Sequence, residues 1–133
     1  MPKGKKYIDR LSLVRKFAEK LKETGDGNLL LLIWAVIAGL SQTEEDLKIF
    51  QKMVSTSKPR SLRPEAMMVL VRLLLETGNL EEARRTAADM HLMEHYSLHA
   101  LAQLRIFRIS GDRDDAELAA QMMKELLASL EPV

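Results

Sequence analysis

The three histidines are the residues whose spacing most resembles a metal site. His91, His95 and His99 follow one another at intervals of four, so on one unbroken helix they would share a face, as metal ligands do. The sequence predicts a helix junction near Tyr96 and Ser97, however, and that junction would break the shared face. We therefore expect these histidines to be ordinary polar residues between helices, and we expect no metal and no other cofactor.

A second group that could support catalysis or bind calcium is the carboxylate cluster Asp112, Asp114 and Asp115, which follows Gly111. Carboxylates at the start of a helix accept hydrogen bonds from its free amides and favour the positive end of its dipole. The spacing of a calcium loop and its terminal glutamate are missing. The chain also has no GxxxxGK[ST] phosphate loop and no recognisable context for a nucleophile. The sequence therefore predicts a protein that is not an enzyme.

Composition favours one helical domain, residues 1–133, with a core of ordinary size. The chain has 47% apolar residues and no cysteine, which suits a reducing compartment, and the cytoplasm is the expected location. We find no targeting segment. The longest apolar run, Leu29 to Leu40, is 12 residues long, whereas a membrane-spanning helix needs about 20. This run predicts a helix at the centre of the core rather than a membrane span.

The charge of the chain is uneven, although its net value is only +1. Residues 1–23 contain eight Lys or Arg and three Asp or Glu. One hypothesis is a nucleic-acid-binding accessory protein that uses this basic helix. Aromatic residues make up only 5% of the chain and no recognition motif accompanies the charge, so a nucleic-acid partner is not expected. The basic residues in question are Lys3, Lys5, Lys6, Arg10, Arg15 and Lys16.

Helix signals punctuate the whole chain. Glycine, proline and capping residues separate about seven apolar-periodic segments of helical length, and none shows the alternation of a strand. Ser41 and Glu44 have the spacing of a capping box at the start of one helix. The prediction is an all-α fold with a basic helix over residues 1–24 and helix pairs over residues 28–57, 64–93 and 97–130.

The two C-terminal pairs contain an internal repeat. The segment Glu76–Ala83 lines up with Ile109–Ala116, which places Gly78 and Gly111 33 residues apart as helix-ending glycines. Gly39 is a weaker third mark of the same kind. This offset is close to the 34-residue period of tetratricopeptide repeats.

The shared G-(N/D)-x-(E/D)-(E/D)-A core resembles the inter-helix turn of the tetratricopeptide family, over residues 64–127. The resemblance implies antiparallel helix pairs stacked as an α-solenoid. The chain departs from the family at Val71 and Leu104, where the family has small residues, and at Ala87 and Ala120, where it has bulky ones. Such an exchange conserves core volume.

A looser similarity is to the small tetratricopeptide-like chaperones of bacterial type III secretion, which hold an aggregation-prone subunit. It rests on chain size, helical pairs and the segment Leu70-Val71-Arg72-Leu73 before a turn. The lysine and asparagine clamp with which some tetratricopeptide proteins bind a C-terminal carboxylate is not matched.

The repeat phase predicts a concave groove formed by the first helix of each pair. Apolar residues interleaved with arginines suit an amphipathic helix or extended segment that carries acidic residues. The sequence therefore favours an adaptor or small chaperone that binds another protein. The remaining alternative is a structural homo-oligomer in which another copy fills the groove. The predicted groove residues are Ile33, Val36, Met68, Arg72, Leu75, Leu101, Arg105 and Arg108.

Overall fold

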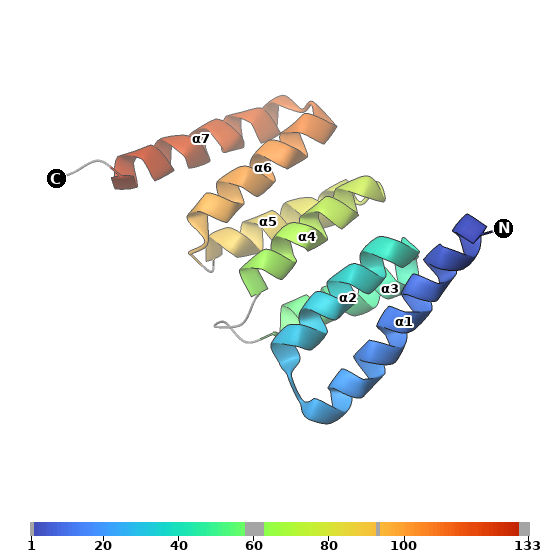
Figure 1. The fold of residues 1–133 in the computed structure, drawn as a ribbon. Helices are drawn as coiled ribbons and strands as arrows, with labels where there is room; N and C mark the ends of the chain where they lie inside the picture. Colours follow the sequence, from blue (N-terminus) through green and yellow to red (C-terminus); the bar gives the residue numbers. More distant parts are fainter. Residues whose placement is uncertain (1, 58–62, 93, 131–133) are drawn as a thin grey trace. The chain divides into compact units, whose positions relative to one another are not determined.

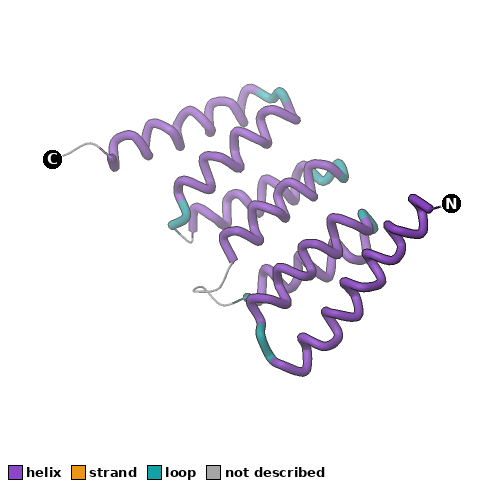
Figure 2. The backbone as a smooth tube through the Cα atoms, viewed as in Figure 1, coloured by secondary structure: helices purple, strands orange, loops and turns teal. Residues whose placement is uncertain are grey.

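The computed structural model describes residues 2–57, 63–92 and 94–130, with side chains from residue 10 onward. This part of the chain is all-helical, as the sequence predicted, and contains seven helices and no strand (Figures 1 and 2). The helices are α1 (Pro2–Thr24), α2 (Gly27–Ser41), α3 (Glu44–Thr56), α4 (Arg63–Glu76), α5 (Leu80–Leu92), α6 (Tyr96–Ser110) and α7 (Arg113–Leu130).

The helices group into two compact units, residues 1–66 and 67–133, so the division falls within α4. In the first unit α2 packs against both α1 and α3. In the second unit α6 packs in the same way against α5 and α7 (Figure 1). Each unit therefore contains a trio of helices with one central helix.

The two trios match residue by residue at an offset of 69 positions. Leu11, Ala18 and Ile37 in the first trio correspond to Leu80, Ala87 and Ile106 in the second. The ends of the central helices also match, because α2 is followed by Gln42 with φ 53° and α6 by Gly111 with φ 66°. The same three-helix arrangement thus occurs twice in the chain.

Residues in the left-handed conformation follow five of the described helices, at Gly25, Gln42, Gly78, Glu94 and Gly111. Gly78 and Gly111 follow α4 and α6 with φ values of 80° and 66°, which confirms the prediction that these glycines end helices. Gly39 was expected to mark a third end, but it lies inside α2. That helix ends at Ser41, and the amide of its C-cap residue Gln42 donates to the carbonyl of Ala38 at 3.1 Å.

The predicted capping box at Ser41 and Glu44 is wrong. Ser41 is the last residue of α2, and the N-cap of α3 is Thr43, whose hydroxyl accepts a hydrogen bond from the amide of Asp46. Thr43 also donates to the carboxylate of Asp46 at 2.9 Å. The N-cap therefore lies two residues later than predicted, because α2 continues to Ser41, and the backbone amide of Thr43 donates to the Ser41 hydroxyl at 3.3 Å rather than to a carboxylate as in a capping box.

The apolar segment Leu29–Leu40 is not enclosed on all sides, contrary to expectation. Ile37 and Leu31 are buried, but Val36 remains 46% exposed. Within its unit α2 packs against α1 and α3, and these two helices leave one side of it uncovered. The apolar composition of α2 predicted a fully enclosed helix. Because only α1 and α3 pack against it within the unit, one side stays exposed.

The left-handed conformation of Gly111 leads to a stability prediction. Gly111→Val should lower the free energy of unfolding by about 1–2 kcal/mol, because an L side chain is strained at positive φ. An added Cβ would meet no atom within 4 Å, so collision does not contribute. Gly39→Ala is the matched control, since Gly39 is helical and its Cβ position is equally open. The control should gain about 0.8–1 kcal/mol in urea unfolding, and a gain of the same sign at Gly111 would contradict the assignment.

Candidate functional site

One side of α2 carries an exposed apolar stripe. Leu29, Leu32, Val36 and Leu40, here called the α2 stripe, are each 36–46% exposed and follow one another at intervals of three, four and four. Such spacing places them on one side of the helix. The whole helix, GNLLLLIWAVIAGLS, contains no charged residue. The uncovered side of α2 is therefore apolar where a solvated helix is normally polar.

The two predicted groove residues on α2 lie on or beside this stripe. Val36 belongs to it, and Ile33 is half-buried next to it. Leu29, Leu32 and Leu40 were not predicted as surface residues, because the apolar run that contains them was expected to form an enclosed core. Their spacing was the available signal, but an apolar helix shows the same spacing on several sides at once.

The remaining predicted groove residues lie on α4 and α6 in the second unit. On α6, Leu101 is 42% exposed, and Arg105 and Arg108 are exposed on the following turns of the same side. The nearby Leu104 and Phe107 are also exposed, and sequence reasoning had not included them.

On α4, Arg72 is exposed and lies 3.7 Å from Glu76, while Met68 and Leu75 are half-buried. Of the eight predicted residues, Ile33 and Val36 belong to the first unit and the other six to the second. None of the eight is fully buried. The structure thus leaves all of them accessible.

The helices that flank the α2 stripe are joined by an ion pair. The guanidinium of Arg15 in α1 donates two hydrogen bonds to Asp46 in α3, at 3.1 and 2.6 Å. Arg15 holds the pKa of Asp46 below its ordinary value of 3.8, although burial alone would raise it. The pair fixes the spacing between α1 and α3 across the central helix.

The second unit repeats this ion pair. Arg84 in α5 donates to both carboxylate oxygens of Asp115 in α7, at 3.1 and 2.6 Å, and to Asp112 at 2.8 Å. The Ser110 hydroxyl and the Gln103 amide also donate to Asp115, at 2.6 and 3.2 Å. These fixed partners give the carboxylate a structural role.

The sequence analysis placed this aspartate cluster correctly at the start of a helix but missed the ion pair. Arg84 and Asp115 stand 69 positions after Arg15 and Asp46, and both pairs span 31 residues. We name the two ion pairs the arginine clamps. Their common spacing was the signal in the sequence that could have revealed them.

The helix junction predicted near Tyr96 and Ser97 lies earlier, because both residues are inside α6, so it separates His91 from the other two histidines rather than His95 from His99. The break lies between Leu92 and Tyr96, with His95 at the N-cap of α6. The rings of His91 and His99 nevertheless lie 5.3 Å apart. No group of three metal-binding side chains occurs among the residues that the structure describes.

His91 and His99 line a cavity of about 450 Å³ within the second unit, with Leu92, Leu118 and Met122 among its apolar walls. The Nδ1 atoms of both histidines are buried and have no hydrogen-bond partner among the described residues. Burial and the neighbouring His91 hold the pKa of His99 below its ordinary value of 6.5, while Glu125 acts in the opposite direction.

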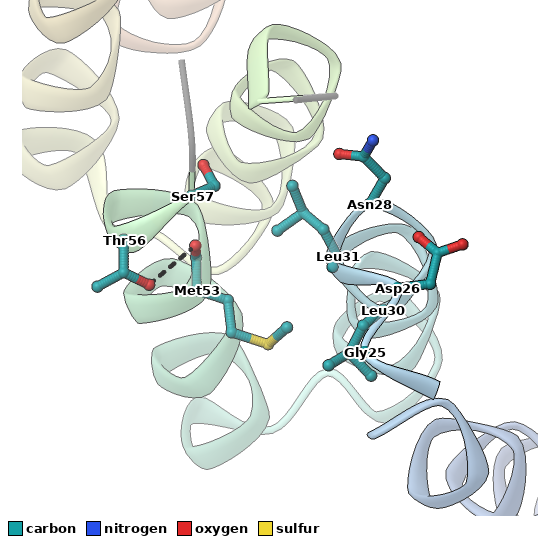
Figure 3. Close-up of a pocket in the computed structure, with 9 residues that line it drawn as sticks. Gly25, Asp26, Asn28, Leu30, Leu31, Met53, Thr56 and Ser57 are labelled. Atoms are coloured by element: carbon teal, nitrogen blue, oxygen red, sulfur yellow. Dashed lines mark hydrogen bonds between the residues drawn. The ribbon is translucent and has the colours of Figure 1, made fainter. Parts of the chain in front are cut away.

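A second cavity, of about 500 Å³, lies in the first unit between the start of α2 and the end of α3 (Figure 3). Asp26 caps α2 by accepting from the amide of Leu29. The Thr56 hydroxyl donates to the carbonyl of Met53 at 3.3 Å, as Figure 3 shows. The polar groups here satisfy helix ends and form no arrangement for covalent chemistry.

The chain matches no protein-family model, no curated protein and no solved structure. Among the described helices, none combines the length and the apolar character that crossing a membrane requires. The arginine clamps and the α2 stripe are therefore the structural features on which a functional interpretation rests.

The clamp at Asp115 predicts a specific acid sensitivity. Because the folded pKa lies below 3.8, this group stabilises the fold above that pH and loses its contribution as pH falls through the folded pKa. Asp115→Asn should therefore be less stable than the wild type at pH 7, with the difference shrinking below about pH 3.8. Urea unfolding across pH measures this. Asp114→Asn removes the same charge from the same helical turn without touching Arg84, and an identical loss in both variants would contradict the clamp.

His99 predicts a second pH effect, in a different range. A buried histidine with a lowered pKa binds fewer protons when folded, so its contribution is complete above pH 6.5 and declines as pH falls through the folded pKa. His99→Leu, which introduces the residue found at the matching position Leu30, should flatten the stability profile between pH 7 and 5. His95→Ser is the control and should retain the wild-type slope. An unchanged slope in His99→Leu would show that other groups cause it.

Proposed function

We propose that this protein is a non-catalytic adaptor or small chaperone that holds an amphipathic segment of another protein. The observation that carries the proposal is the α2 stripe, a row of four exposed apolar residues on a helix without charges. Single exposed leucines are ordinary, but contiguous apolar patches usually mark interaction sites. A partner that covers the stripe would remove this apolar surface from water.

The dimensions of the stripe favour a helical ligand. Leu29 and Leu40 are eleven residues apart, which corresponds to about 16 Å along a helix. An amphipathic helix of three turns presents apolar side chains over the same length. The expected ligand is therefore an apolar helix face, as in other helix-in-groove complexes.

In the second unit, the arginines of α6 favour acidic residues on a segment that binds there. Arg105 and Arg108 are exposed beside Leu101, so the surface combines an apolar contact with two positive charges. Charges at the rim of an interface contribute to partner choice and association rate more than to affinity. Because the chain has no cysteine, a reducing compartment suits it, and we propose that it acts in the cytoplasm.

The nucleic-acid alternative gains no support from the basic first helix. Arg15 is bound to Asp46 and serves the clamp. The side chains of Lys3, Lys5 and Lys6 lie outside the described residues. No specific observation therefore favours this function over protein binding.

The proposal predicts that a charge introduced into the α2 stripe, or among the exposed apolar residues of α6, abolishes partner capture. Val36→Glu should fold normally, because the position is exposed, and it should lose the protein that the wild type captures from its native cell through the α2 stripe. Leu101→Glu tests the exposed apolar residues of α6 in the same way. Leu13→Glu is the matched control, since Leu13 is a 68% exposed apolar residue of α1, outside the proposed binding surfaces on α2 and α6. Capture that survives in both Val36→Glu and Leu101→Glu would overturn the proposal.

Salt dependence separates this proposal from binding through the basic helix. Binding driven by buried apolar area should change little as salt rises, whereas ionic binding falls steeply. Deleting residues 1–6 should leave capture intact. Capture that is lost on this deletion, and that is sensitive to moderate salt, would place the partner on the basic helix instead.

A further inference from the structure

The last helix carries a second apolar stripe that belongs to no site described above. We call Ala116, Ala120, Met123, Leu127 and Leu130 the α7 stripe. Met123, Leu127 and Leu130 are 39%, 64% and 72% exposed, and Ala120 is exposed as well. The stripe runs beside the buried row Asp115, Ala119 and Met122, on the helix that packs against α6 (Figure 1).

The equivalent positions on α5 are buried, which shows how a stripe of this kind can pack. Ala83, Ala87 and Met90 stand 33 positions before Ala116, Ala120 and Met123, and all three are fully buried in the helix that packs against α6. On α1 the corresponding Ala18 and Leu21 are buried in the helix that packs against α2. On α5 and α1, the side that corresponds to the α7 stripe is therefore buried, and its central residue is an alanine, Ala87 or Ala18.

We propose that the α7 stripe is the interface of a symmetric dimer, in which α7 of a second copy of this chain packs against it in antiparallel orientation. The intervals of four and three along the stripe are those of a coiled-coil seam. In the antiparallel register of such a seam, Ala120 meets Met123 of the partner subunit, and Ala116 meets Leu127 of the partner subunit. Twofold symmetry makes each contact twice.

Residue size selects this orientation. The stripe is small at its N-terminal end, with Ala116 and Ala120, and large at its C-terminal end, with Met123, Leu127 and Leu130. Antiparallel packing sets small side chains against large ones and fills the space between the helices. Parallel packing would set alanine against alanine at one end and leave voids that cost stability.

Charge supports the same register. Glu117 and Lys124 flank the α7 stripe on one edge, and the antiparallel seam brings Glu117 next to Lys124 of the partner subunit. Each dimer then contains two such opposite-charge pairs. In the single chain Glu117 accepts from Arg113 at 3.0 Å, in an exposed pair that is easily exchanged. A twofold interface of this kind closes on itself and gives a dimer rather than a filament.

Sedimentation equilibrium of the full chain over a range of concentrations tests the proposal. The wild type should reach the mass of a dimer, and Ala120→Glu should remain a monomer because it places carboxylates in the seam. Ala128→Glu is the matched control, since Ala128 is an exposed alanine of the same helix outside the stripe, and it should dimerise like the wild type. A wild type that stays monomeric, or an Ala120→Glu variant that still dimerises, would overturn the proposal.

A charge swap tests the register. Glu117→Lys should weaken dimerisation about tenfold, because two attractive pairs become repulsive, and adding Lys124→Glu should restore it. The absence of cysteine allows a second readout: mixing Ala120→Cys with Met123→Cys should give mainly the mixed disulfide. Failure of both the rescue and the mixed disulfide would show that the helices pair differently. Val36→Glu should dimerise normally, so this proposal and the proposed function fail independently.

Discussion

The architecture depends on an arginine of one outer helix that binds a carboxylate in the first turn of the other outer helix. Arg15 donates to Asp46 from Nη1 and Nη2, and Arg84 donates to Asp115 from Nε and Nη2, so each guanidinium binds both carboxylate oxygens. Each aspartate is nearly buried, so its charge is stable only because fixed donors compensate for the lost water. Removing the arginine would leave a carboxylate that must be rehydrated, which requires the two helices to separate.

The clamp explains why the central helices remain open on one side. It joins α1 to α3 and α5 to α7, so each central helix has a neighbour at two sides and a free third side. On α2 that free side is apolar, and such exposure reduces solubility without stabilising the isolated chain. A surface of this kind is consistent with a role in binding, because a partner helix would bury it.

The same physics applies to α7, but with a different consequence. Its stripe repeats the pattern that is buried on α5, and the small-to-large gradient from Ala116 to Leu130 makes the surface complementary to itself. The α2 stripe has no such gradient and no charged edge. We therefore propose different occupants for the two stripes: a helix of another protein for the α2 stripe and a second copy of this chain for the α7 stripe.

The sequence by itself determined the helices and most of their ends, because these depend on local chemistry. Gly78 and Gly111 end helices through the conformational freedom of glycine, and the break before Tyr96 separates two periodic segments. The tertiary structure alone decided that α2 exposes one side, that His91 meets His99 across a helix break, and that Arg84 reaches Asp115. Each of these features depends on which helix lies beside which, and the pattern within one helix does not specify its neighbours.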